Sequence, residues 1–552
     1  MSTPFCLIYG ASYAPFFQGS MYLWACPSGQ RPLCDQSGRI QSILPHIVEV
    51  FNSCHSLLMP DSANPDEDKN SVLRSAIWLF VALNCLFLLT TTGRVRTMDE
   101  VMTYFTTSSL ALHGTTAVPQ AQSAGLFYGK LDINGVARAA YPVGQPLVSV
   151  PWFLVGDYIL LNLPEVPPQA HDPVMAFAVT CSNATITAFI GALAYLLFCA
   201  MGLTLRASLY TTLAMIFGTQ LFAYSGWYFS EPLTTALLLA ATLALFDGTL
   251  DLPLPISRVI LAGAILGAAV WVRPTQIISV AIFAFALLIR EWPRGNKQAV
   301  FTTLNLGFSS GFFVLAYLVN NKRLFGSSFD FGYPSTAEFG HQLNGFTTPF
   351  FTGFTGFLFS PGKSIFLFAP VIIAAIFALP LLWKRDRGLA TLAAAMPIAS
   401  LLFYSKYAQW EGGYCYGPRY FVPALALLCI SLAPVFAGAS SKLKTLAIIG
   451  VAAGTIINLI GLSTSFLENQ ATRGIYYDSG LNYVWSHSSI TAQAFLFWKY
   501  LIEGDNTSIG LGFDRWFVFL HKAGVGNGVI IALAIIPIIG LILSFNMYRK
   551  NK

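Results

Sequence analysis

The chain has 552 residues, of which 55% are hydrophobic and only 10% are charged, and its formal net charge is +6. Soluble proteins carry about a quarter charged residues, so a soluble enzyme and a disordered chain are excluded. A nucleic-acid-binding protein is also excluded, because a basic stripe would need many more Lys and Arg than the 31 present. The composition predicts an all-α, polytopic integral membrane protein.

Residues 1–70 differ from the rest of the chain. They contain no charged stretch followed by an apolar core, as a signal peptide would, and they end in the polar sequence PDSANPDEDKN. We consider two interpretations: a loosely ordered cytoplasmic tail, or a misassigned gene start with the true start near Met59. Four of the nine cysteines lie here, and no cysteine or histidine spacing in the chain is typical of a metal site.

Apolar runs long enough, or nearly long enough, to cross a bilayer as a helix of about 20 residues follow this tail. About twelve occur, centred on 72–91, 174–203, 208–225, 232–247, 259–272, 275–289, 299–319, 361–383, 389–405, 420–437, 444–463 and 526–547. The two short runs on either side of Arg273 and Pro274 represent either two spans or one broken helix.

Alternating these spans across the membrane collects the flanking basic residues on one side. They are Arg206, Arg290, Arg294, Lys297, Lys384, Arg385, Arg387, Lys442, Lys444, Arg549, Lys550 and Lys552. By the positive-inside rule this side is the cytoplasm, and both termini lie there. The chemistry is therefore expected on the external side.

Three long segments face that external side: 93–172, 320–360 and 464–525. In the first, the apolar run 146–161 is interpreted as an interfacial or re-entrant helix. The second is rich in Gly, Phe, Thr and Ser, and is interpreted as a mobile lid or, alternatively, an inert packed loop. The predicted organisation is a transmembrane core over 71–463, an external segment of unknown role over 464–525, and a last helix with a basic tail over 526–552.

The first external segment begins with an acidic pair, Asp99 and Glu100. Thr97 and Glu100 have the spacing of a helix capping box, and apolar residues then recur at helical spacing, which predicts an amphipathic helix on the membrane. Asp99 lies in the first turn, where the helix dipole stabilises a carboxylate. Both residues have a structural interpretation as cap and dipole partner, and a catalytic one because they follow the first span beside Arg94 and Arg96.

Several short motifs resemble the GT-C superfamily of membrane glycosyltransferases, and most nearly the protein O-mannosyltransferase and lipid A aminoarabinose transferase group. Besides the acidic pair they are Tyr141–Leu147 (YPVGQPL), Phe229–Pro232 (FSEP), Arg273–Thr275 (RPT), Ser360–Lys363 (SPGK) and Trp410–Tyr420 (WEGGYCYGPRY). Together they cover roughly residues 72–460. Cys415 departs from the pattern, and the soluble C-terminal domain of some branches is absent, which leaves the acceptor open.

The resemblance implies an inverting transfer of a sugar from a polyprenyl-phosphate donor to an acceptor hydroxyl, with amphipathic jaw-type helices in the first external loop. Such a reaction needs one carboxylate as base and cations around the leaving phosphate. The candidate catalytic residues are Asp99 and Glu100. The phosphate-binding candidates are Arg94, Arg273, Lys363 and Arg419, and the sugar- or acceptor-binding candidates are Trp410, Glu411, Tyr416 and Glu231. Snorkelling, helix capping or an aromatic belt are the structural interpretations of these residues.

Two other classes remain open: a lipid-linked-sugar flippase or transporter, and an O-antigen polymerase or ligase that uses a polyprenyl diphosphate donor. A transporter would show internal repeats and charges deep in several spans, and neither is evident. A non-catalytic accessory subunit with the same fold is a third alternative. No cofactor, metal or nucleic-acid partner is expected. The predicted location is a bacterial inner membrane with a periplasmic active site.

Overall fold

The computed structural model describes residues 69–123, 126, 128–163, 165–246, 254–332, 345–472, 478–508 and 511–550. All of them belong to the unit Ser62–Lys552. The predicted N-terminal tail, 1–70, lies outside the described residues except for Lys69 and Asn70, which begin helix α3.

Each of the twelve predicted apolar runs contains helix. The helices are α3 (Lys69–Thr90), α7 (His171–Ala200), α8 (Leu205–Gly218), α10 (Glu231–Leu245), α11 (Ile256–Val272), α12 (Ile277–Glu291), α13 (Asn296–Phe325), α17 (Val371–Arg385), α18 (Arg387–Tyr404), α19 (Val422–Leu428), α20 (Ser441–Ser463) and α24 (Asn527–Lys550). Within the described residues, eight helical segments are long and apolar enough to cross a membrane, and α10, α11 and α15 (Phe350–Phe359) are shorter apolar helices. The prediction of an all-α, polytopic membrane protein is confirmed.

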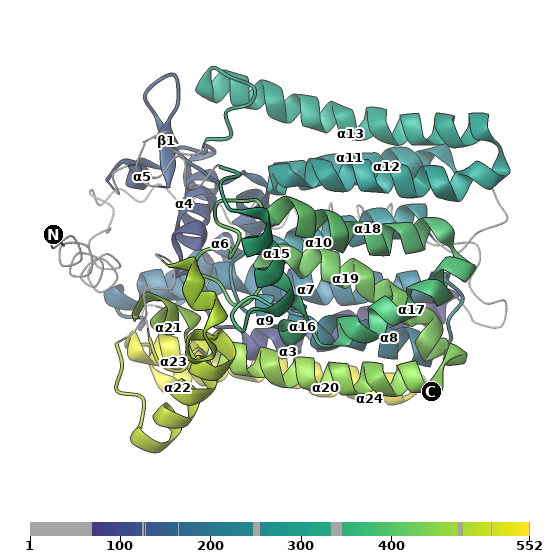
Figure 1. The fold of residues 1–552 in the computed structure, drawn as a ribbon. Helices are drawn as coiled ribbons and strands as arrows, with labels where there is room; N and C mark the ends of the chain where they lie inside the picture. The colour runs from purple at the N-terminus through teal and green to yellow at the C-terminus, as the bar shows by residue number, and fades with distance from the viewer. Residues whose placement is uncertain are drawn as a thin grey trace, which may run out of the picture. The chain divides into compact units, whose positions relative to one another are not determined.

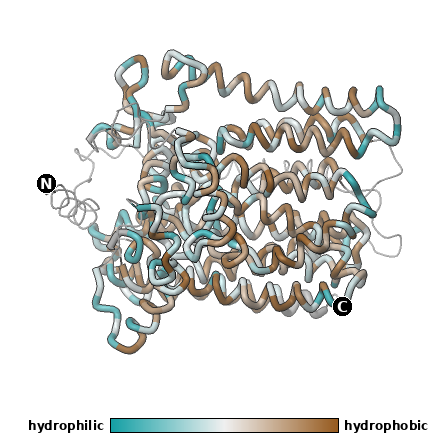
Figure 2. The backbone as a smooth tube through the Cα atoms, in the orientation of Figure 1, coloured by the Kyte–Doolittle hydropathy of each residue, from teal (hydrophilic) through white to brown (hydrophobic). Residues whose placement is uncertain are grey.

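Two helical segments form the centre of this bundle. In both α7 and Arg419–Ala439, 83% of the apolar window is buried inside the protein, against 22% in α13 and 11% in α24. Helix α7 contains seven Ala and three Thr among its 30 residues, and such small side chains let neighbouring backbones approach closely. Hydrophobic residues run along the long helices, and hydrophilic residues gather at helix ends and loops (Figure 2). A functional site built from polar side chains is therefore expected at the helix ends.

Parts of two predicted external segments lie at the same end of the bundle. The first provides α4 (Met98–His113), α5 (Pro119–Ser123), the hairpin β1 (Gly129–Leu131) and β2 (Ala137–Ala139), and α6 (Gly144–Asn162). The last provides α21 (Phe466–Thr472), η7 (Ser479–Tyr483), η8 (Trp485–His487), α22 (Ser489–Glu503) and α23 (Trp516–Lys522). Figure 1 shows α4, α5, α22 and α23 at this end, and the C-terminus at the other.

Helix α4 begins with the predicted capping box. The backbone N–H of Glu100 donates to the Thr97 hydroxyl, and the Glu100 carboxylate accepts from the backbone N–H of Thr97. The predicted apolar stripe is the more open side of the helix. The buried side consists of Glu100, Met102 and a group of hydroxyl residues, Thr103, Thr106, Thr107 and Ser109. The three threonine hydroxyls each donate to the carbonyl four residues earlier, so these groups are buried with a hydrogen-bond partner.

The second external segment is described only in part, because residues 333–344 of the predicted lid lie outside the described residues. Its first residues are held to the hairpin by an ion pair between Lys130 and Asp330. The backbone N–H of Ile133 also donates to the carbonyl of Leu324, at 2.8 Å. These contacts fix the end of α13 against the first external segment.

Candidate active site

Asp99 lies in the first turn of α4, where two donors hold its carboxylate. The Tyr141 hydroxyl donates to Oδ1 at 2.6 Å, and Nη1 of Arg419 donates to Oδ2 at 2.7 Å. Arg419 is 320 residues away in the sequence, at the start of the short helix η4 (Arg419–Phe421). The Asp99 side chain remains 27% exposed, so a substrate group can reach it.

Arg419 connects Asp99 to a second ion pair. Its Nε lies 3.9 Å from Oε1 of Glu231, and the same oxygen pairs with Nη1 of Arg273. Glu231 is the first residue of α10, and Arg273 follows the last residue of α11 with an extended backbone. The result is an alternating row, Asp99–Arg419–Glu231–Arg273, in which two carboxylates balance two guanidinium groups. All four are predicted site residues, and we call them the charged row.

Aromatic rings cover the two arginines. The Arg419 guanidinium lies 5.2 Å from the Phe229 ring and 5.3 Å from the Tyr420 ring, and Arg273 lies 5.4 Å from Tyr420. Tyr420 is itself stacked on Tyr404 at 4.2 Å. No role was predicted for Tyr141, Tyr404 or Tyr420. The sequence did contain a signal for two of them, because Tyr141 opens the YPVGQPL motif and Tyr420 ends the WEGGYCYGPRY motif.

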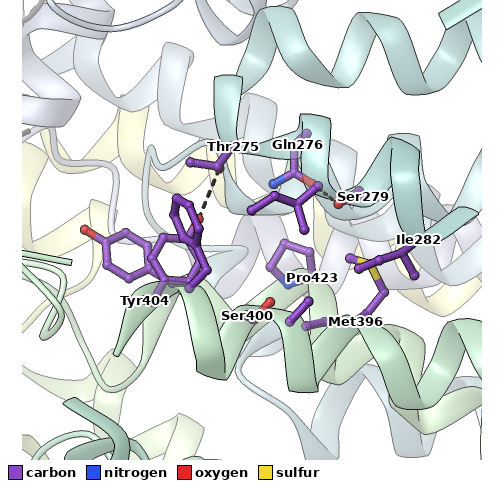
Figure 3. Close-up of a pocket in the computed structure, with 13 residues that line it drawn as sticks. Thr275, Gln276, Ser279, Ile282, Met396, Ser400, Tyr404 and Pro423 are labelled. Carbon is purple, nitrogen blue, oxygen red and sulfur yellow. Dashed lines mark hydrogen bonds between the residues drawn. The ribbon is translucent and has the colours of Figure 1, made fainter. Parts of the chain in front are cut away.

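A cavity adjoins the Tyr404–Tyr420 stack. It is lined by Thr275, Gln276, Ile278, Ser279, Ile282, Met396, Ala399, Ser400, Phe403, Tyr404, Tyr420, Pro423 and Ala424. In Figure 3 the Thr275 and Tyr404 hydroxyls are joined at 3.1 Å at one end of the cavity, and Ile282 and Met396 lie at the other. The cavity therefore lies between α12 and α18 beside the charged row, and hydroxyl and amide groups line it together with apolar side chains.

Glu100 is placed differently from its neighbour Asp99. Its carboxylate is completely buried and accepts from the backbone N–H groups of Arg96, Thr97 and Tyr228, at 3.1, 2.9 and 3.0 Å. Burial raises the pKa of this carboxyl, against the opposing effects of the Arg96 charge and of the three N–H donors. Glu100 therefore fixes α4 to the segment that leads into α10, and both of its oxygens accept from backbone N–H groups.

We expect Glu100→Gln to destabilise the protein by about 1–3 kcal/mol, because the amide cannot accept all three backbone donors and leaves the Arg96 charge less well balanced. The measurement is the melting temperature of the purified protein in detergent. Glu503→Gln, at the exposed end of α22, is the matched control and should leave the melting temperature unchanged. Equal melting temperatures for the two variants would contradict this role for Glu100.

Arg94, predicted to bind phosphate, is not brought to the charged row. It is 2% exposed, its Nη2 donates to the carbonyl of Phe513 at 2.9 Å, and its Nε lies 3.5 Å from Oδ1 of Asp514. Arg96 pairs with the other oxygen of the same Asp514. The structure thus uses both arginines to join the start of α4 to the segment before α23.

Lys363 and the WEGGYCYGPRY motif form a buried group beside Arg419. The Lys363 ammonium donates to the carbonyls of Cys415 and Gly417, each at 3.3 Å. Glu411 is 6% exposed, and burial raises the pKa of its carboxyl, against the charges of Lys363 and Arg419. The lysine therefore ties the motif's backbone to the SPGK turn.

Two aromatic candidates for sugar binding are packed inside. Trp410 is 1% exposed and meets Phe357 edge to face, with ring centroids 5.4 Å apart. Tyr416 is fully buried, and its hydroxyl donates to the carbonyl of Ile457 at 2.7 Å. Neither ring offers a free face in this structure, because neighbouring side chains occupy the space that a sugar would need.

No family model matches the chain, and no curated protein matches it closely. The chain is similar to the crystal structure of ArnT from Cupriavidus metallidurans bound to undecaprenyl phosphate. The sequence identity is 15%, the TM-score is 0.41, and the match covers 85% of this chain and 75% of that chain.

Proposed function

We propose that this protein is an inverting glycosyltransferase that moves a sugar from a polyprenyl-phosphate donor to an acceptor hydroxyl. The observation that supports this most directly is the charged row, which places a partly exposed carboxylate, Asp99, one hydrogen bond from Arg419, with Arg273 behind it. A base for the acceptor and cations for the leaving phosphate are the two requirements of such a transfer. The same residues belong to the motifs that resemble the GT-C superfamily, and this resemblance rests on the sequence alone.

In the proposed reaction, Asp99 takes the proton of the acceptor hydroxyl as that oxygen bonds to the anomeric carbon. The bond between the anomeric carbon and the phosphate oxygen breaks, and the electron pair leaves with the phosphate. Arg419 and Arg273 balance the negative charge of the departing group. Glu231, only 2% exposed, orients both arginines, and Tyr141 orients the carboxylate of Asp99.

The positions of the remaining candidate residues indicate which of them can bind phosphate and which can contact the sugar or the acceptor. Arg273 and Arg419 are better placed for phosphate than Arg94 or Lys363, whose charged groups are buried and bonded to protein carbonyls. Glu411 lies beside Lys363 and is a candidate for contact with the sugar or the acceptor. No cofactor or metal is required by this reaction.

We place this site on the periplasmic side of a bacterial inner membrane, with both termini in the cytoplasm. The described elements of the segments that we assign to that side lie at one end of the bundle, and the C-terminus lies at the other (Figure 1). The basic residues that flank the spans support the same orientation by the positive-inside rule.

A donor panel tests the proposed function. The purified protein is incubated with polyprenyl-phosphate sugars, the matching polyprenyl-diphosphate sugars and native membrane extract, and released lipid is measured. We expect release of free polyprenyl phosphate from at least one monophosphate donor, with an inverted anomeric configuration in the product. Turnover of diphosphate donors alone would favour the polymerase or ligase class, and binding without any turnover would favour a transporter or accessory protein.

A further inference from the structure

Helix α22 leaves one face uncovered by any described residue. Phe495, Trp498 and Ile502 are 63%, 60% and 79% exposed, and their spacing of three and four residues places them on the same side of the helix. Lys499 lies on this face as well and is exposed. The opposite face is buried and includes Ala492, Gln493 and Tyr500. In this helix the polar Gln493 side chain therefore lies inside the protein, and the large apolar side chains lie on the outside.

The helix is attached at the level where a membrane span ends. Nε2 of Gln493 donates to the carbonyls of Gly461 and Thr464, at 2.8 and 2.6 Å. Gly461 belongs to the last turn of α20, one of the helices long and apolar enough to cross a membrane. The outward apolar surface of α20 continues to Leu459, which is 43% exposed, two residues before this junction. In Figure 1, α22 lies beside the end of α20 that is farther from the C-terminus.

We infer that α22 is an interfacial helix that lies in the headgroup region of the bilayer, with Phe495, Trp498 and Ile502 in contact with lipid. With 15 residues it is too short to span, and a patch of large apolar side chains facing water would be unfavourable. Tryptophan is favoured at the membrane interface, and the Lys499 ammonium can reach the phosphate groups while its stem lies along the apolar face.

The bilayer fits this face better than a second copy of the chain does. Helix α22 is bonded to the last turn of α20, whose exposed apolar side chains must face lipid if α20 spans the membrane. Trp485, 58% exposed on the neighbouring η8, adds a second interfacial tryptophan four residues before the helix. The segment 464–525, whose role the sequence left unknown, thereby gains an anchor in the membrane. This inference does not depend on the proposed chemistry.

Site-directed spin labelling of the full chain in phosphatidylcholine nanodiscs tests whether α22 lies in the membrane interface. Labels are placed at Phe495→Cys, Trp498→Cys and Ile502→Cys, with Ile449→Cys on α20 as the lipid reference and Asn134→Cys on the hairpin as the water reference. Ile449 is 61% exposed and Asn134 is exposed, so neither label disturbs the interior. The unsubstituted protein gives the background from its own cysteines. The readout is the ratio of collision rates with oxygen and with a water-soluble nickel chelate.

We expect all three α22 labels to show ratios on the lipid side of the scale, shallower than Ile449 and clearly different from Asn134. Ratios equal to that of Asn134 would show a face open to water and would overturn the inference. Low access to both reagents, together with dipolar coupling between labels, would show that a second copy covers the face and would overturn it as well. Three separate positions keep the test valid if one variant folds poorly.

Discussion

Replacement of Asp99 by Asn is expected to reduce turnover by about 10²–10⁴-fold, the usual contribution of a general base. The amide keeps the shape of the side chain, and its single oxygen can still accept from Tyr141 or from Arg419, but its nitrogen accepts from neither and the side chain cannot take a proton. Binding of the donor should not weaken. In the free protein one N–H group of Arg419 donates to the Asp99 carboxylate. When the negative charge of Asp99 is removed, the Arg419 guanidinium is more available to a phosphate. The measurement is release of free polyprenyl phosphate, with donor binding followed in parallel.

Asp157→Asn is the matched control for this experiment. Asp157 is a half-buried carboxylate on α6, within the same external segment but outside the charged row, and its replacement should leave turnover within about twofold. Equal turnover in Asp99→Asn and wild type would remove Asp99 from the role of base. Loss of turnover together with loss of donor binding would indicate that the substitution damages the site as a whole.

The sequence predicted the residues of the charged row, but it did not predict which of them pair with one another. Asp99, Glu231, Arg273 and Arg419 each lie at a helix end, and a chain of apolar spans leaves charged residues few other places. Their grouping could not be predicted, because it depends on which helix ends meet, and Asp99 and Arg419 are 320 residues apart. The capping box was predictable because it is local, and the structure confirms it.

The burial of Trp410 and Tyr416 was not evident from the sequence, where both rings are candidates for contact with a sugar or the acceptor. Gly356 and Gly461 instead let each ring pack directly against the backbone of another helix: a Cβ at Gly356 would lie 2.3 Å from the Trp410 ring, and one at Gly461 would lie 2.6 Å from the Tyr416 ring. Such close approach depends on residues distant in the sequence, so the motif alone could not indicate it.

The same limit applies to Arg94 and Arg96, whose partner Asp514 lies in a segment that matches no motif. Asp514 is completely buried, its two oxygens serve the two arginines, and its backbone N–H donates to the carbonyl of Ser463 at 2.9 Å. Asp514 therefore joins the end of α20, through its backbone N–H, to the residues that lead into α4, through its carboxylate. Burial lowers the pKa of Arg94, and the charge of Asp514 opposes this effect.

Asp514→Asn is accordingly expected to destabilise the protein more than Glu100→Gln or Asp99→Asn does. It removes the carboxylate that pairs directly with both buried guanidinium groups, and breaking a buried ion pair in this way costs about 3–5 kcal/mol. The melting temperature in detergent should fall well below that of Glu100→Gln, while Asp478→Asn, at an exposed position of the same segment, should melt like the wild type. Because Arg96 precedes the cap of α4, turnover should fall with stability, and Asp514→Glu should recover part of both. A melting temperature unchanged by Asp514→Asn would mean that the arginines are balanced elsewhere, and the segment would then have no part in holding the Asp99 helix.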